Sequence, residues 1–196
     1  MVKTVNIAIA SVGGQGGLTL SRVLAVAAVL DGLSVRTGET LGMAQRYGSV
    51  VSYVRIGARV FSPTFSESEG DYLLGLELLE TTRALRLLKP SGLVIVSDTI
   101  RPPISASLNR EVYDKNKLVD YIRSYAKTLV VPAQKLATEV GNPRAANMVL
   151  LGVFHRHQDL ITDTSMRKAI SEVIPPKWLE SSLRAFELGL SFIEER

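Results

Sequence analysis

The sequence predicts an α/β protein: a three-layer, Rossmann-like domain with a mostly parallel, mixed sheet, one antiparallel hairpin and a helical C-terminal third. Three observations carry this prediction. Short apolar runs alternate with helix-like stretches, a glycine-rich turn joins the first run to the first helix, and strand patterns stop after residue 132. With 196 residues, the chain has the length of one domain, and we expect residues 1–196 to form it.

The N-terminal region has the pattern of a strand, a glycine loop, a helix and a second strand. Residues 5–12 (VNIAIASV) form an apolar run that ends at the glycine loop, residues 13–17 (GGQGG). Apolar residues then recur at helical spacing up to Gly32, and residues 33–37 resume an extended pattern. Residues 5–37 have the length of one right-handed βαβ unit, which predicts a parallel sheet.

The next region predicts a loop and the hairpin. Residues 38–48 (GETLGMAQRYG) contain three glycines and no sustained periodicity, which is typical of an ordered loop. Residues 49–56 have the pattern of a strand rich in Val and Tyr. The dipeptide Gly57-Ala58 separates this strand from residues 59–61, and we expect the two segments to form a tight antiparallel hairpin.

The middle of the chain repeats the β-α-β rhythm. Residues 71–74 predict a brief strand, and residues 77–88 place leucines on one helical face. A turn at residues 89–92 (KPSG) leads into the apolar run 93–96, which is typical of a buried strand.

The C-terminal region becomes helical after one further strand. Asp114 is placed to cap a helix that runs to about Lys127, and residues 129–131 predict the last strand. From residue 133 onward only helices are expected. The last of them, around residues 181–193, is amphipathic and is expected to pack back on the sheet.

Composition limits the chemistry that this chain can perform alone. It contains no cysteine, which excludes disulfides, cysteine nucleophiles and the usual thiolate-bound iron–sulfur clusters. Electron transfer must therefore use another chain or a bound organic cofactor. The only histidines, His155 and His157, alternate along an apparent helix, so we expect two solvated side chains near its end and no metal site. No complete catalytic set can be nominated from spacing.

Charge and hydropathy limit the partners. The formal net charge is +4, from 23 basic and 19 acidic residues that are interspersed, which favours solubility and gives no argument for nucleic acid. No apolar run reaches the ~18 residues of a membrane span, and the N-terminus enters a strand pattern directly. We therefore expect a cytoplasmic protein without a membrane partner.

The glycine loop is the most informative candidate site. Glycines at a strand-to-helix junction let backbone N–H groups approach an anion, and the helix N-terminus adds its positive end. The spacing is neither G-x-G-x-x-G nor that of a P-loop, because Thr19 stands at the third glycine position and no Gly-Lys-Ser/Thr follows. Spacing alone leaves a phosphate-binding loop and a tight packing turn equally open.

Other polar residues have two interpretations each. Arg46 either offers a planar fork to phosphate or carboxylate or, the favoured role, is a surface arginine that pairs with a local carboxylate such as Glu39. Asp98 follows a predicted strand, where it could face a ligand or cap a turn. Asn147 either holds a loop backbone, the favoured role, or touches a ligand. A solvated, ion-paired helix face is expected of Glu77, Glu80, Arg83 and Arg86.

Three motifs in order carry a family resemblance. They are the glycine loop, residues 42–50 (GMAQRYGSV), and residues 141–143 (GNP) with Asn147, and the similarity extends to residues 185–189 (AFELG). Nearly end to end, the chain resembles the gamma-type domain of 2-oxoacid:ferredoxin oxidoreductases, most closely the small (beta) subunit of indolepyruvate:ferredoxin oxidoreductase. It departs from the family at Ser11 and Tyr47, where family members usually have glycine.

The resemblance implies a subunit, inactive alone, of an enzyme that oxidatively decarboxylates arylpyruvates, forms acyl-coenzyme A and reduces ferredoxin. Thiamine diphosphate and iron–sulfur clusters are then expected on a large partner subunit of a hetero-oligomer, with coenzyme A as co-substrate. The residues implied at the contact edge of the thiamine or coenzyme A pocket are Gly13, Gly14, Gln15, Gly16, Gly17, Gln45 and Arg46. A pyruvate or branched-chain oxidoreductase gamma subunit, a free-standing nucleotide-binding module and an interaction scaffold remain alternatives.

Overall fold

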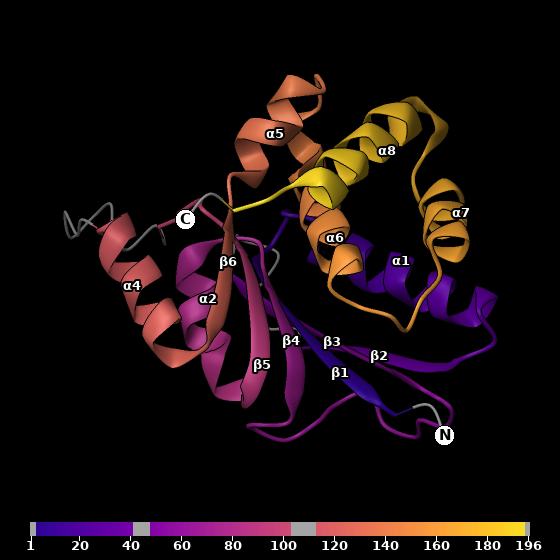
Figure 1. The fold of residues 1–196 in the computed structure, drawn as a ribbon, viewed down its shortest axis with the longest axis horizontal. Helices are drawn as coiled ribbons and strands as arrows, with labels where there is room; N and C mark the ends of the chain where they lie inside the picture. Colours follow the sequence, from indigo (N-terminus) through magenta and orange to yellow (C-terminus); the bar gives the residue numbers. More distant parts are fainter. Residues whose placement is uncertain (1–2, 41–47, 103–112, 195–196) are drawn as a thin grey trace.

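The computed structural model describes residues 3–40, 48–102 and 113–194, which form a mixed sheet between two layers of helices (Figure 1). In spatial order the strands are β2-β3-β1-β4-β5-β6. β1, β4, β5 and β6 are parallel neighbours, whereas β3 is antiparallel to both β1 and β2. The predicted three-layer α/β fold with a mostly parallel sheet is confirmed. The strands are β1 (Val5–Val12), β2 (Ser34–Thr40), β3 (Ser49–Gly57), β4 (Gly70–Gly75), β5 (Leu88–Ser97) and β6 (Lys127–Val131).

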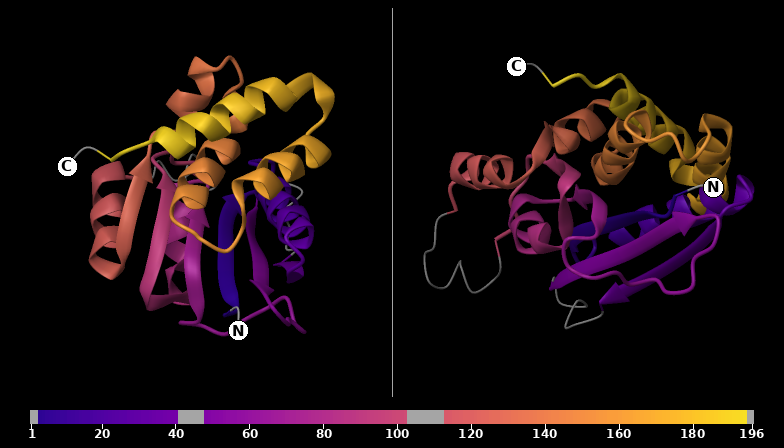
Figure 2. Two further views of the ribbon diagram at one scale, coloured as in Figure 1. Left: turned by 45° about the vertical axis from the view of Figure 1, so that its right-hand side comes forward. Right: turned by 60° about the horizontal axis from the view of Figure 1, so that its bottom comes forward.

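Helices cover both faces of the sheet, which makes the central strands apolar on both sides. In β1, Ile7 and Ile9 face the layer of α1, α6, α7 and α8, whereas Ala8 and Ala10 face the layer of α2 and α4 (Figure 2). All four side chains are fully buried. The helices are α1 (Gly17–Leu30), α2 (Leu78–Ala84), α4 (Lys115–Tyr125), α5 (Ala133–Glu139), α6 (Ala146–Arg156), α7 (Asp163–Val173) and α8 (Pro176–Ser191), with 3-10 turns η2 (Leu85–Leu87) and η3 (Pro143–Ala145).

The predicted hairpin is wrong in its partner. β3 is antiparallel, but it pairs with β2 on one side and β1 on the other, and residues 59–61 form no strand. Both edges of β3 are therefore hydrogen-bonded to other strands, and neither edge is free to pair with residues 59–61. The same insertion separates β1 from β2, so residues 5–37 are not a unit with two adjacent parallel strands. The predicted turn at 89–92 lies within β5, where the register to β4 is irregular.

The terminal helix α8 packs chiefly on α6, which covers the sheet, and Ala185 and Phe186 of α8 belong to the same buried core as Ile9 of β1. Two glycines bring the helices together. A Cβ on Gly189 would collide with the Val149 carbonyl oxygen, and a Cβ on Gly152 would collide with the Phe186 carbonyl oxygen. The AFELG segment is thus half of a close helix crossing.

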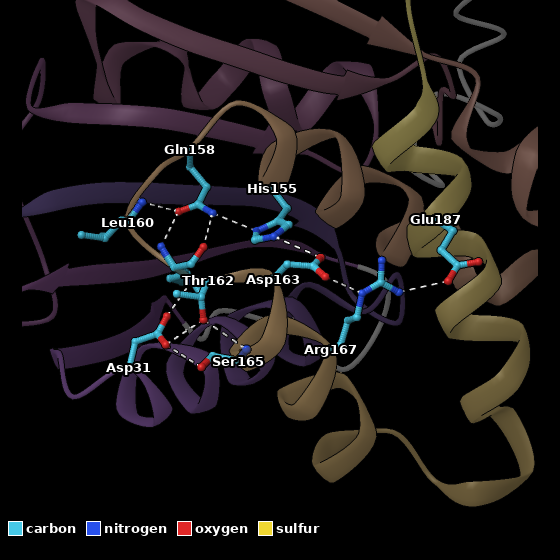
Figure 3. A network of polar contacts seen from close by, with 10 residues as sticks. Asp31, His155, Gln158, Leu160, Thr162, Asp163, Ser165, Arg167 and Glu187 are labelled. Atoms are coloured by element: carbon cyan, nitrogen blue, oxygen red, sulfur yellow. Dashed lines mark hydrogen bonds and ion pairs between the residues drawn. The ribbon is translucent and has the colours of Figure 1, made fainter.

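A polar network joins α1, α6, α7 and α8 (Figure 3). Asp31, at the end of α1, accepts hydrogen bonds from the Thr162 N–H (2.6 Å), the Thr162 hydroxyl (2.8 Å) and the Ser165 hydroxyl (2.5 Å). Thr162 also caps α7 through the Ser165 N–H. The C-terminal end of α1 is thereby held to the N-terminal end of α7.

His155 lies at the centre of the other half of this network, and the expectation that both histidines are solvated is wrong for it. Its side chain is 8% exposed. The Gln158 side-chain oxygen accepts from the Leu160 and Ile161 N–H groups, so its amide nitrogen donates to His155 Nδ1 (2.8 Å). Nε2 therefore carries the proton and faces Asp163 at 3.5 Å.

The buried histidine predicts acid lability. Burial lowers the pKa of His155 below its ordinary value, outweighing the nearby Asp163 and Asp31 carboxylates, while the Arg167 guanidinium acts in the same direction as burial. As pH falls below about 6.5, the unfolded chain takes up this proton first, so folding free energy present above that pH is lost. Urea unfolding at about pH 7.5 and about pH 5.5 should show a larger loss for the native protein than for H155Q. H157Q, at an exposed position, should behave as the native protein does; equal losses in all three would contradict the assignment.

Candidate functional site

A cleft of about 670 Å³ lies at the carboxyl edge of the parallel strands. The glycine loop and the start of α1 form one wall, and residues beyond the ends of β4 and β5 form the floor. The turn η3, the start of α6 and the connection from α7 to α8 close the other side. Open α/β sheets bind ligands at this edge because loops, not core, occupy it.

The glycine loop needs its glycines for two different reasons. Gly14 and Gly16 have φ angles of +88° and +89°, which residues other than glycine rarely adopt. A Cβ on Gly16 would also lie 2.5 Å from Asn147 Nδ2, and one on Gly17 would lie 2.7 Å from Ser11 Oγ. Gly16 and Gly17 thus permit close packing, whereas nothing lies within 4 Å of a Cβ on Gly14, which faces the cleft.

Two amide side chains hold the glycine loop in place. Gln15 Oε1 accepts from the Val12 N–H (2.7 Å), and Gln15 Nε2 donates to the Leu76 carbonyl beyond β4 (3.2 Å). Asn147 Nδ2 donates to the Gly16 carbonyl (3.3 Å). Asn147 therefore holds a loop backbone, the favoured interpretation from sequence.

The other residues that the sequence nominated for the site do not line the cleft in the described part of the chain. Gln45 and Arg46 lie outside the described residues. The Gly13 N–H donates to the Gly48 carbonyl (3.0 Å), which places Gly48 beside the glycine loop. Asp98 pairs with Lys115 (2.6 Å) and is not among the described residues that line the cleft.

Three arginines line the cleft, and sequence reasoning missed all of them as site residues. Arg22 comes from α1, Arg101 from the segment after β5 and Arg144 from η3. No Asp or Glu is among the described lining residues. No sequence spacing relates these three positions, because only the sheet topology brings the three segments together.

Glu77 anchors the segment that carries Arg101, and the expected solvated face is wrong for it. Its side chain caps α2 by accepting from the Leu79 and Glu80 N–H groups, and it also accepts from the Arg101 N–H (3.2 Å). Glu77 is fully buried, and burial raises its pKa despite these backbone hydrogen bonds. Glu80 is also buried and pairs with Arg83 (2.5 Å), while Arg86 pairs with Glu67.

The arrangement suits an anion. The first-turn N–H groups of a helix have no partners within it, and α1 has neither a capping side chain nor an acidic residue in its first turn. Guanidinium groups add permanent positive charge around the same space. In the described part of the chain no three His, Asp or Glu residues group as metal ligands, and no helix is long and apolar enough to cross a membrane.

Fold and site define this chain as a Rossmann-like α/β protein with a basic cleft at the carboxyl edge of its sheet. Residues 6–192 match the pyruvate ferredoxin/flavodoxin oxidoreductase family, and the chain belongs to that family. The indolepyruvate oxidoreductase subunit IorB of Thermococcus kodakarensis is 36% identical over 99% of this chain and 98% of its own length. The IorB subunit of Pyrococcus horikoshii is 35% identical over the same shares. The pyruvate synthase subunit PorC of Methanocaldococcus jannaschii is 25% identical over 90% of each chain.

Solved structures share the fold. The gamma subunit of a keto/oxoacid ferredoxin oxidoreductase from Geobacter sulfurreducens superposes with a TM-score of 0.72 at 22% identity, covering 95% of this chain and 96% of that one. The 2-oxoglutarate:ferredoxin oxidoreductase of Magnetococcus marinus, solved with 2-oxoglutarate, coenzyme A and succinyl-CoA, gives 0.74 at 19% identity over 96% of this chain and 31% of that chain. The resemblance drawn from the motifs is confirmed: the chain is a homologue of small subunits of 2-oxoacid:ferredoxin oxidoreductases.

Proposed function

We propose that this chain is the small subunit of an indolepyruvate:ferredoxin oxidoreductase. In the overall reaction an arylpyruvate and coenzyme A yield CO2 and an aryl-acetyl thioester. The C1–C2 bond of the oxoacid breaks, a C–S bond forms, and the two electrons released reduce two ferredoxins while the thiol proton leaves to solvent. The single observation behind the proposal is the near end-to-end similarity to indolepyruvate oxidoreductase subunits, which exceeds the similarity to pyruvate synthase subunits.

The proposal divides the chemistry between two chains. Thiamine diphosphate, when bound, supplies the carbanion chemistry that removes CO2, and iron–sulfur clusters carry the electrons; both belong to a large partner subunit, and this chain is cytoplasmic. This chain has no cysteine to ligate a cluster, which suits that division. Its own part is to present the cleft and the glycine loop, residues 13–17, together with Gln45 and Arg46, at the edge where the coenzyme A or thiamine pocket is completed.

The test is a substrate panel with the assembled enzyme. The chain and a large subunit from the same organism are co-expressed, and coenzyme A-dependent reduction of ferredoxin is measured with indolepyruvate, pyruvate and a branched-chain oxoacid. We expect kcat/KM for indolepyruvate to exceed the other two by at least about tenfold, which corresponds to about 1.4 kcal/mol of transition-state discrimination. A complex that prefers pyruvate or the branched-chain acid would overturn the assignment in favour of those subunit classes.

A further inference from the structure

The edge strand β6 has an open outer side. It lies at one end of the sheet and pairs only with β5 (Figure 1). The Val131 carbonyl accepts from the Asp98 N–H (2.9 Å) on the β5 side, so alternation along the strand directs the backbone groups of Thr128 and Val130 outward. In the described part of the chain, no other backbone group bonds to that outer side. Free backbone groups along an edge are a template for a further strand.

One of the outward N–H groups already binds a carboxylate. Glu194, in the segment that follows α8, accepts from the Val130 N–H (3.2 Å) and from the Arg123 guanidinium (2.6 Å) through the same oxygen, Oε1. A backbone donor of β6 and a cation of α4 therefore hold the carboxylate together. The Glu194 side chain is 22% exposed, so this contact lies at the surface, where a carboxylate of another chain can replace it.

A basic hollow of about 630 Å³ lies beside the same strand. Its walls come from α4, β6, the end of α6 and the segment after α8. Arg123, Lys127 and Arg156 line it, whereas Glu194 is the only carboxylate among its described lining residues. Arg156 bonds to a carbonyl, that of Leu190, and no described carboxylate pairs with it or with Lys127. The excess of positive charge favours an acidic ligand.

An extended peptide fits these features better than a small anion or a second copy of this chain. A small anion would use the cations and leave the Thr128 backbone and Ile193, which is 70% exposed and lines the hollow, without a role. A second copy related by a twofold axis would set Lys127 and Arg156 against their own counterparts, and these like charges would repel one another. An acidic segment in extended conformation uses the strand edge, the cations and the apolar side chain together.

We propose that the outer edge of β6 and the hollow beside it dock an extended, acidic segment of the large partner subunit. The segment adds a strand to the sheet and brings a carboxylate to the place that Glu194 holds. The inference rests on the proposed function for the identity of the partner, and it adds the surface and the chemistry by which the two chains recognise each other.

Hydrogen exchange read residue by residue tests the added strand. The purified full chain is compared with its complex with the large subunit. The Thr128 N–H faces outward without a described partner, and its exchange should slow at least about tenfold in the complex. The N–H groups of Leu129 and Val131 face β5 and already bond within the sheet, so they are the internal reference and should change much less.

Matched variants test the charge complementarity. K127E reverses an exposed charge and should weaken association with the large subunit about tenfold, because it sets like charges against each other. K168E makes the same change at an exposed position on α7 and should associate as the native chain does. E194Q weakens the internal competitor and should tighten association about threefold, whereas E180Q, exposed on α8, should leave it unchanged.

Three results would overturn the inference: a complex in which the Thr128 N–H exchanges as fast as in the free chain, equal weakening by K127E and K168E, or weaker association of E194Q. Slower Thr128 exchange that depends only on the concentration of this chain would assign the edge to a second copy and would also overturn it. Failure of the proposed function has a different signature, because a complex inactive on every 2-oxoacid would still protect the Thr128 N–H.

Discussion

Replacement of Gly189 by alanine is expected to destabilise the protein by about 3 kcal/mol, although glycine-to-alanine changes inside helices ordinarily stabilise by about 1 kcal/mol. The reason is the crossing of α6 and α8, where an added Cβ would collide with the Val149 carbonyl oxygen and lie 3.0 Å from the Gly152 Cα. Backbone atoms cannot rotate away as a side chain can. The two helices must therefore separate, and the side chains packed between them lose contact.

Chemical denaturation followed by circular dichroism measures this loss. S191A, at the exposed end of the same helix, is the control and should change the free energy of unfolding by less than about 0.5 kcal/mol. G152A tests the other side of the same crossing and should be as harmful as G189A. If G189A were as stable as the native protein, the close crossing of α6 and α8 would be refuted.

Replacement of Glu77 by alanine should also cost about 3 kcal/mol. The change leaves three N–H groups without their acceptor, two at the start of α2 and one at Arg101. Each unsatisfied buried donor costs about 1–3 kcal/mol, and hydrogen bonds to water that enters the site offset part of this loss. E77Q keeps one acceptor oxygen and nearly the same volume, so it should retain much of the lost stability. Unfolding in urea gives these values, with E67A as the exposed ion-paired control; an effect of E77A no larger than that of E67A would contradict the capping role.

The Glu77 carboxyl also predicts the sign of a pH dependence. Burial raises its pKa in the folded protein above the ordinary value of 4.5, so between 4.5 and the raised pKa the folded state binds more protons than the unfolded state. As the pH falls from neutrality toward 4.5, the native protein should therefore gain stability relative to E77Q. A difference that stays constant across this range would show that the raised pKa is wrong.

The sequence was sufficient for most of the fold because local patterns determine it. The run VNIAIASV predicts β1 because both faces of that strand are buried, and Asp114 predicts the start of α4 because a side-chain cap is a local feature. The strand partners of β3 could not be predicted from the sequence. Whether β3 pairs with β2 or with residues 59–61 depends on which strand edges are free in the completed sheet. The position of α8 likewise depends on a contact between residues far apart in sequence, Gly152 and Gly189.

The candidate site was predicted only where one short segment contains the signal. The glycine loop and Asn147 could be found from residue type and position, and the structure brings them into contact. Arg22, Arg101 and Arg144 could not, because they are far apart in sequence and resemble surface arginines until the sheet edge assembles them. Glu77 and His155 were expected in solvent, since polar side chains usually are; their burial becomes visible only with the backbone groups and side chains that they bond.

We expect this chain to function only as a subunit. A titration tests this expectation: the chain is added to a purified large subunit while ferredoxin reduction by indolepyruvate and coenzyme A is followed. Neither protein alone should turn over substrate, and activity should rise with added chain until the two are equimolar. Full activity of either protein by itself, or a rate that the added chain does not change, would contradict it.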